Sequence, residues 1–103
     1  MAKIAILYTT VAKRTDARKL TKTLLDAKVV ACAVAVDAES SYTWGSKREQ
    51  SKEIALICKT SVKALSRAKK TLAAAHPYTT PCILNWAVEA NSAYAQWVTE
   101  QTR

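Results

Sequence analysis

The strongest constraint on the fold is the stretch His76-Pro77-Tyr78-Thr79-Thr80-Pro81, which holds both prolines and the only histidine of the chain. Proline lacks a backbone N–H and disfavours helical angles at the residue before it, so a helix that reaches this stretch must end there. A basic helical pattern precedes the stretch and a short apolar strand pattern follows it. We therefore predict a helix-to-strand junction. Ligands often bind at such an edge, but the local sequence alone favours a rigid turn with an incidental histidine.

The composition is that of a small globular domain. A length of 103 residues suits one domain, 1–103, with a single core, and a hydrophobic content of 50% argues against disorder. No apolar run approaches the ~20 residues of a membrane-spanning helix, and the apolar N-terminus is read as a strand instead of a signal peptide. The three cysteines, Cys32, Cys58 and Cys82, are too far apart for zinc-finger spacing or a disulfide framework. We therefore expect a reducing, cytoplasmic location and no membrane partner.

The net charge of +8 raises the question of an anionic partner such as nucleic acid. Nine of the sixteen basic residues fall into two groups, one on or just before each of the first two predicted helices, and both groups avoid the apolar stripe. A solvated helix face explains such a pattern. The aromatic-glycine signature of an RNA-recognition motif is missing, and a single glycine is too few for one. Nucleic acid is therefore not expected as a partner.

Hydrophobic periodicity predicts seven elements in the order β-α-β-β-α-β-α. Strands are expected at 3–10, 29–36, 53–60 and 82–88, with 39–44 as a candidate continuation of the second strand and 47–52 as an exposed loop or hairpin end. Thr15 or Asp16 should cap the first helix, which ends at Lys28. The other helix starts are expected at Thr60 or Ser61 and at Asn91 or Ser92.

The second strand divides its side chains sharply between two faces. Positions 30, 32, 34 and 36 carry larger side chains, and positions 31, 33 and 35 carry alanine. Because strand side chains alternate, Cys32 should point away from the alanine face. A face of small side chains lets a helix or another subunit approach closely. Likewise, Ile54, Leu56 and Cys58 should share one face of the next strand.

This order of elements predicts an α+β fold, a ferredoxin-like βαββαβ sandwich with an additional C-terminal helix. The second and third strands are long for so small a domain. A long hairpin that reaches past its own sheet leaves edges to be paired by a neighbouring subunit. We therefore expect assembly as a homotrimer.

Landmarks along nearly the whole chain carry a family resemblance. They are Ala31-Cys32, Ser41-Tyr42-Thr43-Trp44, Glu53, Lys59-Thr60, His76-Pro77-Tyr78-Thr79-Thr80-Pro81, Tyr94 and Trp97. Their order and spacing resemble the CutA family of divalent-cation tolerance proteins. The resemblance implies a fold similar to the PII signalling proteins, a trimer, a role in tolerance of divalent metals with copper binding, and no enzymatic reaction.

The resemblance also implies where a ligand would bind. Cys32 matches the cysteine of the family's Ala-Cys pair. The residues that match positions around the cleft between subunits are Trp44, Glu53, Lys59, His76 and Tyr78.

The sequence departs from the family pattern at several places. Val34 stands where the family has asparagine, and Cys82 where it has glutamate after the second proline. Both changes remove a polar group from the region of the cleft. The glycine after the tryptophan is Ser46, with Gly45 one position early, and the glycine before the last helix is missing.

Four functions are compatible with these residues. In the first, a metal-binding trimer, the metal ligands are Cys32, Glu53, His76 and Cys82, because imidazole and thiolate suit copper or zinc and a carboxylate can add an oxygen ligand. In the second, a PII-like module holds a small anion in the cleft between subunits with Lys59, Trp44 and Tyr78. A small hydrolase using His76 as a base is less favoured, because the sequence places no orienting acid. A purely structural assembly is the fourth.

Overall fold

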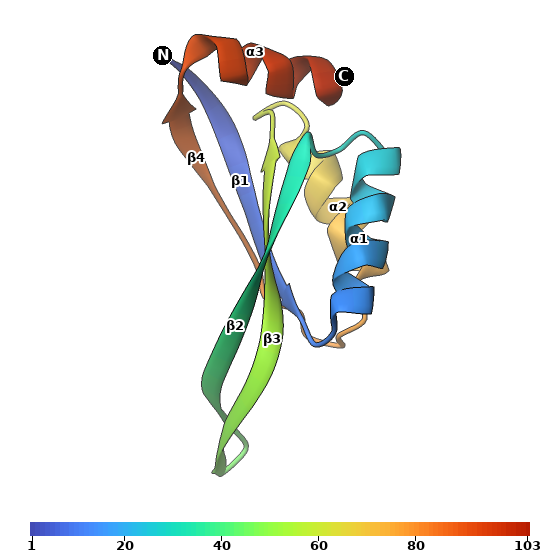
Figure 1. Cartoon of the computed structure of the whole chain (residues 1–103), viewed down its shortest axis with the longest axis vertical. Helices are drawn as coiled ribbons and strands as arrows, with labels where there is room; N and C mark the ends of the chain where they lie inside the picture. Colours follow the sequence, from blue (N-terminus) through green and yellow to red (C-terminus); the bar gives the residue numbers. More distant parts are fainter.

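The computed structural model describes all residues from Met1 to Arg103, and it contains the seven expected elements (Figure 1). They are β1 (Ala2–Val11), α1 (Arg14–Asp26), β2 (Cys32–Trp44), β3 (Lys47–Thr60), α2 (Leu65–Ala75), β4 (Ile83–Ala90) and α3 (Ser92–Gln101).

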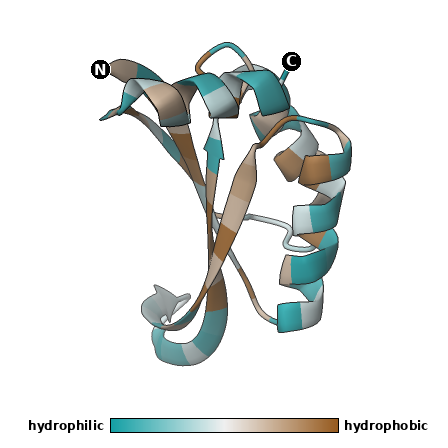
Figure 2. Cartoon of the chain, turned by 45° about the horizontal axis from the view of Figure 1, so that its top comes forward, coloured by the Kyte–Doolittle hydropathy of each residue, from teal (hydrophilic) through white to brown (hydrophobic).

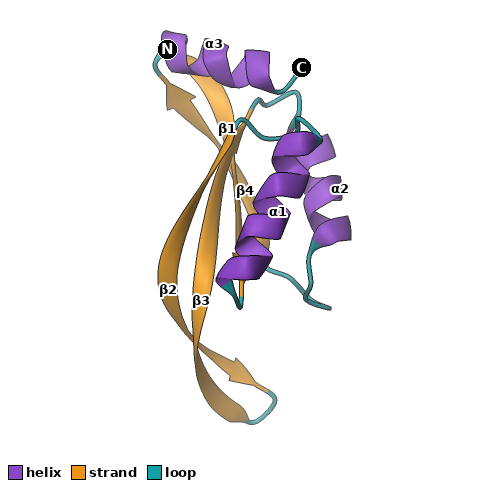
Figure 3. Ribbon diagram, turned by 45° about the vertical axis from the view of Figure 1, so that its right-hand side comes forward, coloured by secondary structure: helices purple, strands orange, loops and turns teal.

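One four-stranded sheet, with the strand order β2-β3-β1-β4, forms the centre of the molecule. All three pairs of neighbouring strands are antiparallel. Helices α1 and α2 lie side by side on one face of the sheet, and α3 crosses its end (Figures 1 and 3). This is the predicted βαββαβ sandwich with an added C-terminal helix. None of the three helices is long and apolar enough to cross a membrane.

The main core lies between the sheet and the α1–α2 layer. Leu7 and Leu56 from the central strands and Leu24 and Leu72 from the two helices have no exposed surface. A smaller cluster lies on the opposite face, where Ile4 of β1 contacts Val98 and its neighbours on α3. The hydrophobic residues accordingly gather in the middle of the sheet and on the inner sides of the helices (Figure 2).

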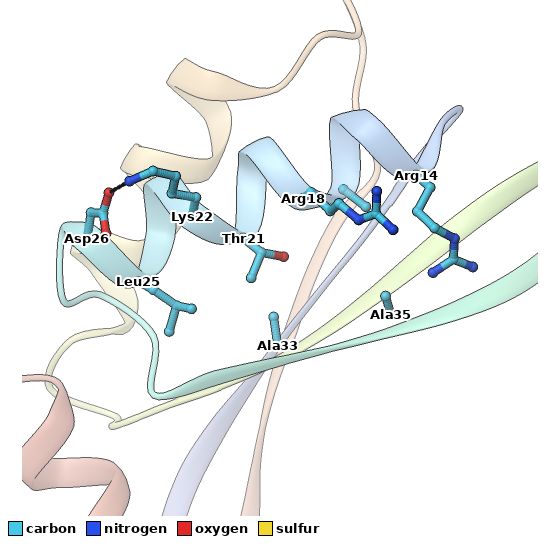
Figure 4. Close-up of a pocket in the computed structure, with 9 residues that line it drawn as sticks. Arg14, Arg18, Thr21, Lys22, Leu25, Asp26, Ala33 and Ala35 are labelled. Atoms are coloured by element: carbon cyan, nitrogen blue, oxygen red, sulfur yellow. Dashed lines mark hydrogen bonds and ion pairs between the residues drawn. The ribbon is translucent and has the colours of Figure 1, made fainter.

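The predicted division of side chains between the faces is confirmed from Cys32 onward in β2 and throughout β3, but it was wrong for Val30 and Ala31. These two residues precede β2, and Val30 lies in the main core while Ala31 lies in the smaller cluster. Ala33 and Ala35 of β2 face α1 (Figure 4), and Cys58 lies in the main core on that side. Cys32 points the other way, where its thiol contacts the hydroxyl of Tyr94 on α3. Alanine leaves room for α1 to approach because it has only a methyl side chain.

The β2–β3 hairpin is longer and more regular than predicted. Residues 47–52 were expected as an exposed loop or a hairpin end; they are the hairpin end and belong to β3. Residues 29–31 precede β2 instead of opening it. Pairing runs without interruption from Cys32–Lys59 to Trp44–Lys47, closed by a tight turn with Gly45 at φ +63°. Beyond the helices this ribbon covers no core, so polar side chains occupy both of its faces. The sequence of this part therefore lacks the hydrophobic alternation by which a strand is predicted.

Several predicted helix and strand ends were wrong by a few residues. Helix α1 begins at Arg14 without a side-chain cap, and it ends at Asp26, two residues before Lys28. Ser61 accepts a hydrogen bond from the Ala64 N–H at 3.1 Å, but this bond caps a turn that precedes α2. Strand β4 covers 83–90, so Cys82 lies just outside it. Asn91 is the N-cap residue of α3, as expected.

Candidate ligand-binding cleft

His76 is a buried part of the turn that follows α2. Its backbone terminates the helix in an extended conformation, at φ −68° and ψ 134°. The Tyr78 N–H donates to Nδ1 at 3.1 Å, which leaves the proton of the neutral ring on Nε2. Nε2 lies 3.0 Å from the Thr10 carbonyl oxygen and 2.9 Å from the Thr9 hydroxyl. Nε2 therefore ties the turn to β1, and Nδ1 braces the turn internally.

Tyr78 continues this network to the long hairpin. Its hydroxyl donates to Oε2 of Glu53 at 2.8 Å, and Ser40 of β2 donates to Oε1 of the same carboxylate at 2.6 Å. Burial, followed by this hydrogen bond to an anion, raises the pKa of Tyr78. The tyrosine therefore remains a proton donor to Glu53 at all ordinary pH values. The His-Pro turn and the hairpin are held together through one carboxylate.

A cleft of about 900 Å³ opens between this turn and the hairpin. Aromatic side chains, two carboxylates and one thiol line it. The twelve lining residues are Thr10, Ala12, Tyr42, Trp44, Glu49, Ser51, Lys52, Glu53, Tyr78, Thr79, Thr80 and Cys82.

The cleft is acidic although the chain is basic. The lining contains two carboxylates, Glu49 and Glu53, and one cation, Lys52. The chain as a whole, in contrast, carries a net charge of +8. A charged site attracts ligands of opposite charge and repels ligands of the same charge, and both effects are stronger in a concave site than on a flat surface. This local surplus of carboxylates favours a cationic ligand over an anionic one.

The structure brings together only part of the residues predicted for the site. Trp44, Glu53, Tyr78 and Cys82 line the cleft, and His76 lies directly behind it. Cys32 and Lys59 pair with each other at the far end of the hairpin, and neither lines the cleft.

The four side chains predicted as metal ligands do not form a cluster within one chain. No group of three or more histidine, cysteine, aspartate and glutamate side chains is close enough to hold a metal ion. Within the chain, Glu53 and Cys82 are the two of the four that share the cleft.

Glu49 and Tyr42 are among the cleft residues that were missed at the sequence level. Glu49 lies on β3 and Tyr42 lies opposite it on β2, so the paired hairpin presents both to the cleft. The sequence around Glu49 was interpreted as an exposed loop or a hairpin end, and no faces were assigned to it. An alternation of side chains that ran through 47–60 would have placed Glu49, Ser51 and Glu53 on one face.

Cys32 forms a separate polar contact at the other end of the sheet. Its thiol lies 3.5 Å from the Tyr94 hydroxyl. This hydrogen bond, together with partial burial, raises the pKa of Tyr94 to about 12. Tyr94 also packs against Trp97, with ring centroids 5.7 Å apart. The Cys32–Tyr94 contact therefore links α3 to β2.

The three thiols should differ widely in reactivity. Cys82 is exposed, Cys32 is half-buried, and Cys58 has no exposed surface. Burial, followed by the negative charge of Cys32, raises the pKa of the Cys58 thiol to about 12. Because the thiolate is the reactive form, we expect a disulfide reagent added to the native protein near pH 8 to modify Cys82 first and to leave Cys58 unmodified.

The prediction is checked by counting released thiolate with time in the native protein and in Cys82→Ser. The variant should lose the fast phase and keep the others, and unfolding in guanidinium should expose every remaining thiol. A fast phase that persists in Cys82→Ser would contradict the assignment.

A second concavity, of about 450 Å³, lies between α1 and β2 (Figure 4). Its floor is formed by Ala33 and Ala35, and its rim carries the cations of α1. Two of these cations already have partners, because Arg14 contacts Asp37 and Lys22 contacts Asp26. This trough is therefore largely neutralised within the chain.

The chain matches one family along nearly all of its length. Residues 5–101 match the family of the CutA1 divalent ion tolerance protein. The divalent-cation tolerance protein CutA of Thermococcus kodakarensis is 35% identical over 94 residues, which is 90% of each chain. The CutA protein of Pyrococcus horikoshii is 34% identical over 99 residues, 95% of this chain and 97% of that one.

Solved structures agree with the sequence comparisons. The divalent ion tolerance protein CutA1 from Ehrlichia chaffeensis superimposes with a TM-score of 0.94 at 34% identity, covering 100% of this chain and 98% of that one. The CutA1 structure from Pyrococcus horikoshii gives a TM-score of 0.92 at 34% identity over 96% of this chain and 98% of that one.

Proposed function

The chain belongs to the CutA1 family of divalent ion tolerance proteins, and from this premise we propose that it acts in metal tolerance as a homotrimer that binds a divalent cation in the cleft beside the His-Pro turn. The proposed role is binding, and no reaction is assigned to the cleft. A cytoplasmic location is part of the proposal, because all three cysteines are free thiols and a reducing compartment keeps them so.

The observation that carries the cation proposal is the charge of the cleft. Two carboxylates and one exposed thiol line a concave surface that contains a single lysine, in a chain with twice as many basic as acidic residues. Carboxylate oxygens and a thiolate are donors for Zn²⁺ and Cu²⁺. The candidate donors are Glu49, Glu53 and Cys82. No three such side chains of one chain lie close enough to share an ion, so one chain would supply at most two of these donors, and water or a neighbouring subunit would fill the remaining positions.

The hydrogen-bond network behind the cleft supports this assignment. Each oxygen of Glu53 accepts one hydrogen bond, from Ser40 or Tyr78, and a carboxylate oxygen has a further lone pair. Ligands oriented by a second layer of hydrogen bonds bind metals more tightly than free side chains. In this proposal His76 contributes through the turn that positions Tyr78, since its own two ring nitrogens are already engaged.

The homotrimer is supported by the face of the sheet that the first two helices leave uncovered. Val34, Val36, Leu84 and Trp86 lie on this face and are 41%, 44%, 52% and 46% exposed. They lie beside Ile6 and Ile57 of the two central strands, and the strand register places all these side chains on the same face of the sheet. This surface is largely apolar, although Lys59 lies on it beside Ile6, and such a surface is typical of an interface with other subunits.

The strand edges support assembly as well. Strands β2 and β4 are the two edges of the sheet, and β2 extends well beyond the helices (Figure 3). Unpaired edges can pair with strands of other molecules and cause aggregation. Pairing the edges with neighbouring copies in a closed assembly prevents this. A closed ring of three chains would satisfy both edges of every sheet.

The anionic-ligand alternative has less support from the single chain. It relied on Lys59 for positive charge, and Lys59 lies outside the cleft lining, which has an excess of carboxylates. An anion would therefore need cations from a neighbouring subunit.

The experiment that tests the proposal is a calorimetric titration of the assembled protein with Zn²⁺ and Cu²⁺, compared with Cys82→Ser and Glu53→Gln. Removing a thiolate or a carboxylate ligand should weaken the affinity at least about tenfold, because a charged donor to a metal is replaced by a neutral one. The assembled mass is measured for each sample, so that loss of binding is separated from loss of assembly.

Cys32→Ser is the matched control, since it makes the same chemical change at the far end of the hairpin. It should bind metal as the unchanged protein does. Equal loss of affinity in both cysteine variants, or saturable binding that neither Cys82→Ser nor Glu53→Gln weakens, would contradict a metal site in the cleft.

A further inference from the structure

We propose that the chain has a second binding site, for a phosphate group, where the end of α3 meets the segment that enters α2. A concavity of about 310 Å³ lies there. The end of α3 is at the upper end of the molecule in Figure 1. Its lining contains no hydrophobic residue. Three cations and three hydroxyls form it: Lys63, Arg67, Arg103, Ser61, Thr99 and Thr102.

Hydrogen bonds that join Arg67 and Ser61 to Thr102, the residue that follows α3, build the wall of this site. Nη2 of Arg67 donates to the Thr102 carbonyl oxygen at 3.1 Å, which holds the guanidinium at the rim of the concavity. The hydroxyls of Thr102 and Ser61 are 3.0 Å apart and both residues are buried. The contacts join segments that are 35 and 41 residues apart in the sequence, so the site exists only in the folded chain.

The cations of this concavity lack acidic partners. The two ion pairs of the chain, Arg14–Asp37 and Lys22–Asp26, lie elsewhere, and no carboxylate side chain lines the concavity. The trough in Figure 4 differs in this respect, because two of its cations are neutralised within the chain. Like charges held together without a counter-ion repel one another, and an anion placed between them relieves that repulsion.

The adjacent helix adds to the positive potential. The first turn of α2 contains no acidic residue, so the partial positive charge of its N-terminus is not offset by a side chain. The 11-residue helix begins two residues after Lys63, next to the concavity. This contribution supports the side-chain cations and does not replace them.

The chemistry of the lining selects the class of ligand. Arginine presents several N–H donors in a plane, and four of the five in Arg67 remain free of the bond to Thr102. A tetrahedral oxyanion with two negative charges can accept from the guanidinium and the Lys63 ammonium at once. Without an apolar wall there is little to hold the body of a larger organic ligand. The ligand is therefore inorganic phosphate or the phosphate group of a small phosphorylated molecule.

This site is independent of the proposed metal cleft. The cleft lies at the end of α2, beside the His-Pro turn, and the cationic concavity lies at its beginning. The two linings share no residue. Failure of one proposal therefore leaves the other standing.

The test is a calorimetric titration with inorganic phosphate and, separately, with glycerol phosphate, at constant ionic strength. The proteins compared are the unchanged chain, Lys63→Gln, Arg67→Gln and the control Lys70→Gln. Lys70 is an exposed residue of the same helix that does not line the concavity. Lys63 makes no hydrogen bond or ion pair in the chain, so its replacement should not disturb folding.

The expected result is saturable binding of one phosphate group per chain, weakened at least about tenfold in Lys63→Gln and in Arg67→Gln and unchanged in Lys70→Gln. Tighter binding of inorganic phosphate than of glycerol phosphate would identify the free ion as the ligand, and the reverse order a phosphorylated molecule. The affinity for Zn²⁺ should be the same in all four proteins. Absence of saturable binding by either ligand, or equal weakening in Lys70→Gln, would overturn the proposal.

Discussion

Replacement of Leu7 by alanine is expected to lower the free energy of unfolding by about 2–5 kcal/mol. Leu7 has no exposed surface and belongs to β1, which lies between β3 and β4. Alanine would remove apolar contacts and leave a cavity between the sheet and the two helices, and a central strand has little freedom to collapse into it. Denaturant unfolding followed by circular dichroism, at one fixed protein concentration, measures the change.

Leu25→Ala is the control for this prediction. Leu25 lies on α1 and is 41% exposed, so the same chemical change there removes far less buried surface. We expect it to cost under about 1 kcal/mol. Comparable losses in the two variants would mean that the main core does not lie where the structure places it.

Val36→Glu is expected to dissociate the proposed homotrimer. Val36 lies on the uncovered face of the sheet and is 44% exposed in the single chain. A glutamate at this position would therefore remain in contact with water in the monomer, and the single chain should still fold. In a trimer joined through this face, each of the three subunits would bury an unpaired carboxylate, which costs several kcal/mol per site. Light scattering should then give a mass near 11.3 kDa instead of about three times that value.

Val62→Glu is the matched control, because Val62 is 54% exposed but lies before α2, away from the uncovered face. It should leave the assembled mass unchanged. A trimer that survives Val36→Glu at micromolar concentration would mean that the subunits meet through another surface. If light scattering gave the mass of a monomer for the unchanged protein, the result would contradict the proposed homotrimer.

The sequence located the His-Pro turn correctly, since Pro77 and Pro81 act on their immediate neighbours whatever the rest of the chain does. It did not determine what His76 contacts. Those partners are Thr9 and Thr10, which lie 67 and 66 residues away. Contacts at such separations depend on how β1 and the turn are placed relative to each other.

The same distinction explains the cleft. The family resemblance pointed to Trp44, Glu53 and Tyr78, and the structure brings these three residues to one concave surface. The resemblance could not place Lys59 outside that lining, because its position relative to the cleft depends on how the hairpin pairs and where the turn packs against it. A strand that covers no core shows no hydrophobic alternation, so its faces cannot be predicted from the sequence pattern.

Burial of one face imposes a local period on the chain, so the order of the elements, the faces of β2 and β3, and the division of Ala33 from Cys32 can be predicted from the pattern of residues. The partners of polar groups, in contrast, depend on the packing of distant segments. The Tyr78–Glu53 bond joins residues 25 apart, and the Arg67–Thr102 contact joins residues 35 apart. Polar side chains on exposed surfaces follow no period, so their partners are selected by the packing of whole elements.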